Sequence, residues 1–213
     1  MGTKERRIRE LGETRERILS AAREMFAEKG YDSVTMRAIA ERIEYTPTAI
    51  YHHFPSKQAL LQELCEQDFD GLARSFGSSV SPADPVERLK SIGAVYLRFA
   101  EEFPSQYRFM FMTVLPKVEF AEERAKQMRE NPERNAYLFL RETCQEAIAT
   151  GRFRPEFGDS DQVAQILWGL VHGIVSLRIT KTHDEFLPWR DLQATAHLAM
   201  DGIIRGMLQD SNS

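Results

Sequence analysis

The chain has 213 residues, of which 42% are hydrophobic and 28% are charged, and its formal net charge at pH 7 is −4. This composition is ordinary for a globular protein and excludes collagen-like, disordered and membrane classes. No apolar run approaches the roughly 20 residues of a membrane span, and the charged N-terminal stretch lacks the apolar middle of a secretory signal. We therefore expect a cytoplasmic protein with no membrane partner.

The charge is distributed unevenly along the chain. Residues 1–57 carry 11 Lys and Arg against 9 Asp and Glu, a balance of +2, which leaves 17 against 23, or −6, for the remainder. Only a local basic face in the first part could therefore bind phosphate. The chain length allows a small domain joined to a larger one, and we expect a first domain at 1–57, with an N-terminal arm at 1–13, and a second domain at 58–213.

The cysteine content argues against disulfides and metal sites. Cys65 and Cys144 are too few for a disulfide framework, and their spacing does not suggest a zinc site. We expect free thiols, no metal and no cofactor.

Helical periodicity dominates the whole chain, so the predicted fold class is all-α. We find no alternating strand pattern, no Asn-Gly hairpin and no repeat at solenoid spacing. The first helix is predicted from about Thr14 to Lys29, with Gly30 as its C-terminal stop. Thr35 can cap a shorter second helix, whose apolar stripe contains Ile39, Ala40 and Ile43.

A third helix of about two turns is predicted from Pro47 to His53. Thr46 is its expected N-cap and Pro47 its first residue, because proline disfavours α geometry in the residue before it. Ile50 and Phe54 should face the core. The outward positions are then Thr48, Tyr51 and His52.

Ser56 can cap a fourth helix that continues to about Phe76, long enough at roughly 30 Å to bridge two domains. The stretch Gly77 to Pro85 is the clearest break in the pattern. Later helices are predicted at Val86 to Phe103, Ser105 to Leu115, Glu119 to Arg129, Pro132 to Thr150, Ser160 to Thr180 and Pro188 to Gln209.

Two short helices joined by a tight turn are typical of DNA binding, although they also occur in ordinary helical packing. The exposed side of the third helix favours DNA binding, because it carries hydroxyl, aromatic and cationic donors suited to base edges and phosphates. These donors are Thr48, Tyr51, His52 and His53, followed by Lys57.

The segment from Thr14 to Leu61 resembles the signature of TetR-family transcriptional regulators. The resemblance rests on the Gly30-Tyr31 turn, the Ile39-Ala40 pair, Ile50-Tyr51, Phe54 and Ser56-Lys57. It implies a helix-turn-helix regulator of operator DNA, in which Arg37, Thr46, Pro47, Thr48 and His52 approach bases while Tyr51, His53 and Lys57 contact phosphates. Glu44 stands where the family usually has glycine. Either Glu44 adopts left-handed backbone geometry, which costs a non-glycine residue about 1 to 2 kcal/mol, or the turn takes a slightly different form.

Several of these residues also have a plainer interpretation. Tyr51 could be a half-buried aromatic side chain, and Arg37 could be a solvated charge. His52 and His53 are not expected to form a metal site, because adjacent helical residues point about 100° apart. The basic residues of the arm, Lys4, Arg6, Arg7 and Arg9, could follow a DNA groove or belong to a frayed terminus.

In the second half, Trp168, His172 and Gly173 resemble the tryptophan-histidine-glycine signature of one C-terminal subclass of these regulators. In that family the last two helices pair with their symmetry mates, which implies a homodimer. Small residues there would permit close approach, with packing inside one chain as the alternative. The predicted dimerisation residues are Gly169, Gly173, Ala196, Ala199 and Ile203.

Bulky apolar side chains in the second half could line a cavity for a small, mostly apolar effector, although such residues are often simply core. The apolar candidates are Phe103, Tyr107, Met110, Phe111, Tyr137 and Trp168. His172 would be a polar contact in this cavity, or else a histidine hydrogen-bonded within the core. The predicted function is a repressor that leaves a palindromic operator when this effector binds.

An enzyme is the second hypothesis, disfavoured because no nucleophile with an adjacent base and no phosphate-binding loop is found. A redox-responsive regulator would need Cys65 or Cys144 as an exposed, low-pKa thiolate.

Overall fold

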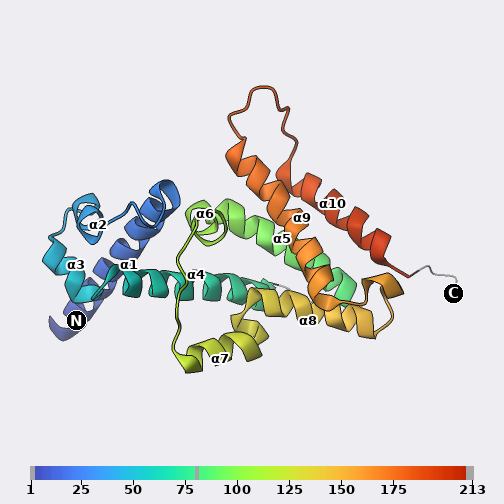
Figure 1. The fold of residues 1–213 in the computed structure, drawn as a ribbon, viewed down its shortest axis with the longest axis horizontal. Coiled ribbons are helices and arrows are strands. Elements are labelled where there is room, and N and C mark those ends of the chain that lie inside the picture. Colours follow the sequence, from blue (N-terminus) through green and yellow to red (C-terminus); the bar gives the residue numbers. More distant parts are fainter. Residues whose placement is uncertain (1–2, 80–81, 210–213) are drawn as a thin grey trace. The chain divides into compact units, whose positions relative to one another are not determined.

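The computed structural model describes residues 3–79 and 82–209, and this part of the chain is all-helical, as predicted (Figure 1). The α-helices are α1 (Thr3–Lys29), α2 (Met36–Arg42), α3 (Pro47–His53), α4 (Lys57–Ser79), α5 (Pro85–Glu102), α6 (Pro104–Met112), α7 (Glu122–Glu130), α8 (Ala136–Ala149), α9 (Ser160–Thr180) and α10 (Leu192–Met207). Two 3₁₀ helices, η1 (Pro132–Arg134) and η2 (Pro155–Phe157), flank α8.

The chain divides into two compact units. The first contains the chain up to Asp68 together with Phe103–Ala121, and the second contains Phe69–Glu102 together with the chain from Glu122 onward. The division falls inside α4, which therefore begins in the first unit and ends in the second. The functional boundary predicted after Lys57 lies at the start of this helix, and it stays a prediction.

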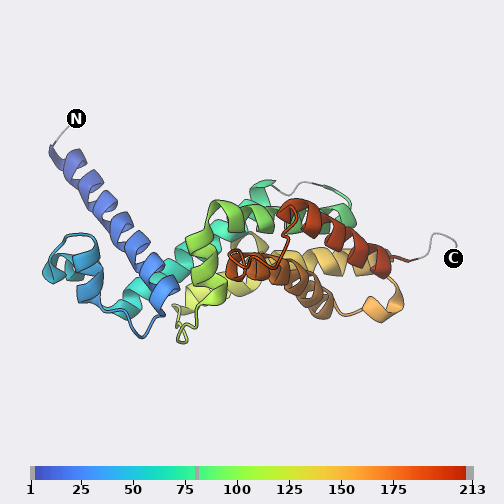
Figure 2. The ribbon, with the colours of Figure 1, turned by 90° about the horizontal axis from the view of Figure 1, so that it is seen from above.

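The first helix is longer than predicted, because α1 begins at Thr3 and not near Thr14. Exposed ion pairs one turn apart, Arg6–Glu10 at 3.2 Å and Arg9–Glu13 at 3.5 Å, support the added turns. Such pairs stabilise an exposed helix by about 0.2–0.5 kcal/mol each. The segment expected to be an arm is therefore helical from Thr3 on (Figure 2), while residues 1–2 and the side chain of Lys4 lie outside the described part.

The core of the first unit forms where α1 packs against α2 and α6. The ring of Phe26 in α1 stacks against that of Phe109 in α6, with centroids 6.3 Å apart. Burying apolar surface of this kind contributes about 25 cal/mol per Å². The fully buried side chains of this core include Ile18, Leu19, Ala22, Phe26, Ile39, Ala40, Ile50, Leu60, Leu61, Tyr107 and Phe109.

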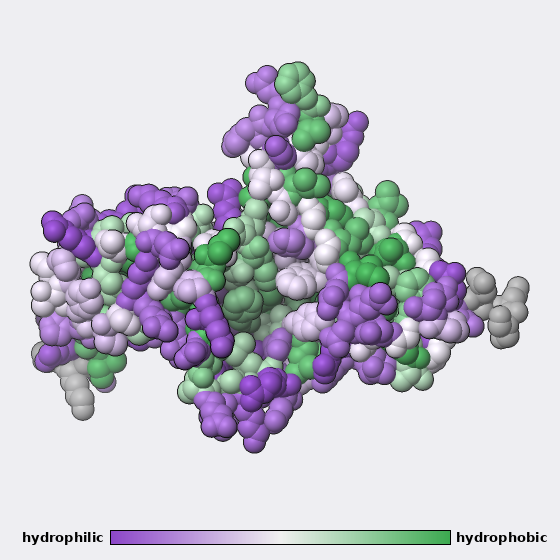
Figure 3. Space-filling view, viewed as in Figure 1, coloured by the Kyte–Doolittle hydropathy of each residue, from purple (hydrophilic) through white to green (hydrophobic). Residues whose placement is uncertain are grey.

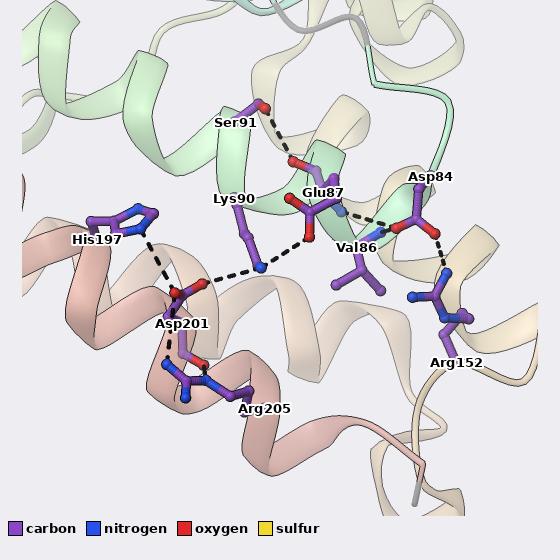
Figure 4. Close-up of polar contacts among 9 residues, drawn as sticks. All are labelled: Asp84, Val86, Glu87, Lys90, Ser91, Arg152, His197, Asp201 and Arg205. Atoms are coloured by element: carbon purple, nitrogen blue, oxygen red, sulfur yellow. Dashed lines mark hydrogen bonds and ion pairs between the residues drawn. The ribbon is translucent and has the colours of Figure 1, made fainter. Parts of the chain in front are cut away.

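The second unit is built from α5, α8, α9 and α10, which pack against one another around buried residues such as Leu89, Cys144, Ala164, Val175 and Ile204. An ion pair on its surface also joins α5 to α10 (Figure 4). Lys90 Nζ lies 2.9 Å from Glu87 Oε1 and 3.1 Å from Asp201 Oδ1. These contacts raise the pKa of Lys90 and lower the pKa of Asp201.

Helix α9 is more apolar than a search for unbroken runs indicates. The sequence has no unbroken apolar run near the roughly 20 residues of a membrane span, yet by length and composition alone this 21-residue helix could cross one, since it contains a window of mean hydropathy 1.4. Polar residues scattered along it, including Gln165, His172 and Ser176, hide this apolar character from a search for an unbroken run. Only 28% of the window is buried within the chain, so much of an apolar helix is exposed.

Candidate functional site

Helix α2 begins and packs as the sequence predicts. The hydroxyl of Thr35 accepts a hydrogen bond from the backbone N–H of Ala38 at 3.1 Å, which satisfies one of the free donors at the helix start. Ile39 and Ala40 are fully buried, and Ile43 is nearly so. The apolar stripe of this helix therefore faces the core of the first unit.

The turn between α2 and α3 keeps the geometry that usually requires glycine. Glu44 has a φ of 60°, in the left-handed region. The backbone N–H of Tyr45 donates to the carbonyl of Ala40 at 2.9 Å, and that of Glu44 donates to Glu41 at 3.2 Å. This pair of bonds is the Schellman arrangement that closes a helix C-terminus. The expected left-handed backbone geometry is therefore confirmed at Glu44, and the alternative of a slightly different turn is not observed.

Helix α3 also begins and orients as predicted. Thr46 caps it by accepting from the N–H of Ala49 at 3.2 Å, and Pro47 is its first residue. Ile50 and Phe54 are buried, at 0% and 1% exposure. The opposite face is exposed and carries five of the predicted DNA-contacting residues, Thr46, Pro47, Thr48, Tyr51 and His52, with Tyr51 at 51% exposure.

Two predicted phosphate contacts are only half-exposed in this structure. The Lys57 ammonium lies 4.0 Å from the ring centroid of Tyr31, and burial lowers the pKa of Lys57 despite the opposing charge of Asp32. Burial and the charge of Arg15 likewise lower the pKa of His53. These two side chains therefore pack against the protein while remaining next to the exposed face of α3.

Arg37 lies on α2, and its surroundings fit the plainer of its two interpretations. Its Nε donates to Glu41 Oε1 at 2.9 Å, and both side chains are mostly exposed, at 79% and 65%. Such an exposed pair is weak, so the guanidinium could exchange this carboxylate for another anion.

Two arginines of α1 that sequence reasoning did not single out join α1 to α4, and one of them also contacts the end of α3. Arg15 binds Glu63 of α4 and donates from Nη1 to the carbonyl of His53 at the end of α3, at 2.8 Å. Arg23 binds both carboxylate oxygens of Asp68 at 2.7 and 2.9 Å. The partners lie 38 to 48 residues away in sequence, so helical periodicity could not identify them.

The predicted effector residues fall into two groups, one in each unit. In the first unit, Tyr107 is fully buried with its ring 5.2 Å from that of Phe111. Met110 is buried at 8% exposure, whereas Phe103 is 44% exposed. Tyr107 and Met110 thus contribute to the core of their own unit, and their role toward a ligand stays a prediction.

In the second unit, the other three predicted effector residues lie together. The Trp168 ring is 6.2 Å from that of Tyr137 and 6.4 Å from that of His172. Tyr137 donates its hydroxyl to Asp161 at 2.7 Å. Sequence reasoning missed Tyr96 of α5, whose hydroxyl oxygen lies 3.2 Å from both Trp168 Nε1 and His172 Nδ1. Burial lowers the pKa of His172.

The predicted dimerisation residues differ in exposure. A Cβ built at Gly169 or Gly173 would meet nothing within 4 Å, so these glycines are not needed for packing inside the chain. Ala199 and Ile203 are half-buried, and Ala196 is fully buried in the core of its own unit. Large apolar side chains on the same two helices are exposed, including Leu177 at 56% and Leu198 at 70%. Figure 3 shows hydrophobic surface over this part of the second unit.

Metal and thiol chemistry find little support. Among the described residues, no group of three or more His, Cys, Asp and Glu side chains could hold a metal ion. Cys65 and Cys144 are buried, and burial raises the pKa of each thiol to about 12. A redox sensor needs an exposed thiolate of low pKa, and neither cysteine provides one.

The capped pair α2 and α3, with polar donors on the open face of α3, defines a helix-turn-helix DNA-binding protein. Two family models match the chain. One, described as bacterial regulatory proteins of the tetR family, matches residues 18–64, and the other, described as a tetracyclin repressor-like C-terminal domain, matches residues 89–203. The chain therefore belongs to the TetR family, which is a family of transcriptional regulators and not of enzymes. The narrower subclass suggested by Trp168, His172 and Gly173 stays a prediction.

Named relatives agree with this assignment. UidR of Escherichia coli (strain K12), an HTH-type transcriptional regulator, is 51% identical over 55 residues, which is 26% of this chain and only 28% of UidR. The repressor KstR2 of Mycobacterium tuberculosis (strain H37Rv) is 30% identical over 156 residues, covering 70% of this chain and 74% of KstR2.

Solved structures share the fold. That of KstR2 from M. tuberculosis, described as a ketosteroid transcriptional regulator, has a TM-score of 0.65 at 22% identity and covers 92% of this chain and 96% of its own. That of PfmR, a TetR-family regulator from Thermus thermophilus, has a TM-score of 0.70 at 25% identity, with 92% and 97% covered.

Proposed function

We propose that this protein is a cytoplasmic, ligand-responsive repressor that binds a palindromic operator as a homodimer and releases it when a small, mostly apolar molecule binds. The observation that carries the proposal is the face of α3, where Thr48, Tyr51 and His52 are exposed while Ile50 is fully buried. A helix oriented this way can place hydroxyl and imidazole groups against base edges in the major groove. The phosphates or neighbouring bases would then be contacted by Arg37, Tyr51, His53 and Lys57.

The dimer is proposed to form through α9 and α10. Gly169, Gly173, Ala199 and Ile203 offer a surface where another helix could approach closely, and exposed Leu177 and Leu198 supply apolar area. We interpret the exposed apolar surface of α9 as this interface and not as a membrane span. A two-fold dimer also matches two half-sites about 34 Å apart on one face of DNA.

The effector is proposed to bind at Tyr137, Trp168 and His172, with Tyr96 as a fourth contact. The aromatic rings of Tyr96, Tyr137 and Trp168 suit a mostly apolar molecule, and the relative KstR2 is described as a ketosteroid regulator. For the first-unit residues Phe103, Tyr107, Met110 and Phe111, a role in ligand binding stays a prediction from the sequence. Because α4 runs through the division between the units, we propose that it transmits the effect of the ligand.

The DNA proposal is tested by selecting genomic fragments with the purified protein and measuring affinity for the selected duplex. Thr48→Ala should change which sequences are preferred, by about 1–3 kcal/mol per misread base pair. Lys57→Ala should weaken all sequences alike and make the salt dependence shallower. If no duplex competes above nonspecific DNA at moderate salt, the regulator proposal fails.

The dimer proposal is tested by sedimentation of Gly173→Glu beside Ile8→Glu, which places the same charge on the exposed part of α1, where Ile8 is 61% exposed. Gly173→Glu should give monomers, because a buried unpaired carboxylate is costly at an interface. Ile8→Glu should remain dimeric. A wild-type protein that is monomeric at micromolar concentration would reject the interface.

A further inference from the structure

A pocket lies where α9 ends and α10 begins, beside the loop that joins these two helices in the second unit (Figure 1). Its volume is about 270 Å³, near the lower end of the range for small-molecule sites, so its ligand would be small. Most of its surface is apolar and includes an indole ring and a proline. Its apolar walls are Ile174, Leu187, Pro188, Trp189 and Leu192, and Arg178 is among its polar residues.

Hydrogen bonds within the chain hold the walls of this pocket in place. The carbonyl of Lys181 accepts from the indole N–H of Trp189 and from the backbone N–H of Asp184, both at 3.0 Å. On the other side of the pocket, Asp191 caps α10 by accepting from the N–H of Ala194 at 2.7 Å. The pocket is therefore formed before a ligand enters, which lowers the cost of binding.

Arg178 is the cation that lines this pocket. Its guanidinium lies 5.5 Å from the ring centroid of Trp189, and its Nη1 donates to the carbonyl of Arg190 at 3.4 Å. The neighbouring carboxylates of Asp184 and Asp191 each accept from a backbone N–H. Within residues 3–79 and 82–209, no carboxylate forms an ion pair with Arg178. Since a guanidinium has several N–H donors, most of those on Arg178 remain for another group.

We propose that this pocket binds a small apolar molecule that bears a carboxylate, which pairs with Arg178 while the apolar part of the molecule packs against Trp189. A planar carboxylate matches the fork of a guanidinium, and such charge-assisted hydrogen bonds are about twice as strong as neutral ones. The site goes beyond the proposed function, because it shares no residue with the proposed effector contacts Tyr137, Trp168 and His172.

The pocket also differs from the proposed dimer surface on α9. Ile174 and Arg178 each come one residue after a proposed contact of that surface, Gly173 and Leu177. Adjacent helical residues point about 100° apart. On α9 the pocket therefore lies beside the dimer surface, and a second chain bound there leaves Ile174 and Arg178 on another side of the helix.

The ligand class is tested with two probes of nearly equal shape, 4-tert-butylbenzoate and 4-tert-butylbenzamide. Trp189 fluorescence reports binding in a Trp168→Phe background, because the chain has two tryptophans. The benzoate should bind about tenfold more tightly than the amide, since only the benzoate carries a charge for Arg178.

Matched variants locate the charge that makes this distinction. Arg178→Met should abolish the preference for the benzoate. Arg205→Met is the control, because it removes the same charge from an exposed side chain about 15 Å along α10 from Thr195, and it should keep the preference. Equal affinity of the two probes, no response of Trp189 to either, or a preference that survives Arg178→Met would overturn the proposal.

A further variant tests whether a second chain fills the pocket instead. Ile203→Glu places a charge in the proposed dimer surface, about 12 Å along α10 from Thr195. The benzoate should bind this variant and the parent protein equally well. Binding to the variant alone would mean that a second chain occupies the pocket, and any unequal affinity would overturn a site formed by one chain. No DNA is present in these titrations, so their outcome is independent of the proposed repressor function.

Discussion

The two regions proposed to carry function are built in different ways. The caps and the turn of the pair α2 and α3 depend on neighbours in sequence. Thr35 and Thr46 each accept a hydrogen bond from a backbone N–H three residues later. The turn at Glu44 is closed by backbone hydrogen bonds that span three and five residues. The cluster of Tyr96, Trp168 and His172 depends on contacts between residues 72 to 76 positions apart. Local rules therefore account for the caps and the turn of the proposed DNA-binding helix, with a long-range hydrogen bond from Arg15 to His53 at its end. The proposed effector site exists only once the second unit has packed.

This difference has a consequence for mutation. The exposed donors of α3 contribute little to the stability of the fold, so replacing them should change DNA binding alone. Tyr96 is buried within a hydrogen-bonded network, where removing one partner leaves another unsatisfied at about 1–3 kcal/mol. Mutations in the first region should therefore change DNA binding without changing the stability of the fold, whereas mutations in the second region should change ligand binding and stability together.

The largest expected effect concerns a long-range ion pair between α1 and α4, next to the first region. Arg23→Met removes the charged partner of Asp68, which is 2% exposed and also has a side-chain hydrogen bond with Gln106, and should lower the free energy of unfolding by about 3–5 kcal/mol. Arg37→Met is the control, since that side chain is 79% exposed and should change stability by less than about 0.5 kcal/mol. Denaturant unfolding measures both, and equal losses would contradict the role of the pair.

The same variant has a predicted pH dependence. Burial raises the pKa of Asp68 even in the wild type, and loss of Arg23 should raise it further. A raised carboxyl pKa means that the folded state binds the proton more tightly than the unfolded state. The destabilisation of Arg23→Met should therefore shrink as the pH falls from neutral through the raised pKa. A loss of unfolding free energy in Arg23→Met that grows as the pH falls would contradict this expectation.

A smaller effect tests the local turn. Glu44→Gly should stabilise the protein by about 1–2 kcal/mol, because glycine adopts the observed φ of 60° without strain. Glu41→Gly, three residues earlier in α2, should instead destabilise by about 1 kcal/mol. Thermal unfolding of the two variants should shift in opposite directions, and a shift in the same direction would mean that the turn is not strained.

The smallest expected effect concerns the thiols. Cys65 and Cys144 are buried with pKa values of about 12, so a disulfide reagent should leave both unmodified in the native protein and modify two thiols per chain after denaturation. Replacing both by serine should leave any DNA response to oxidants unchanged. Prompt modification of either cysteine under native conditions would revive the redox hypothesis.

Sequence periodicity and capping rules predicted much of the fold. They identified α3 from Pro47 to His53 and α9 from Ser160 to Thr180 with the bounds observed. They failed at the start of α1, because exposed ion pairs support a helix that has no apolar stripe there. They also could not find Tyr96, since nothing near it in sequence indicates which residue of α9 it meets.

The most direct test of the account compares operator affinity for one variant from each region. Tyr51→Ala removes an exposed ring of α3, and Trp168→Phe removes the indole donor to Tyr96 while keeping an aromatic ring. On the duplex recovered by fragment selection, Tyr51→Ala should weaken binding by about tenfold, or about 1.4 kcal/mol, and Trp168→Phe by less than about twofold. Equal losses in the two variants, or no loss in Tyr51→Ala, would contradict the assignment of DNA reading to α3.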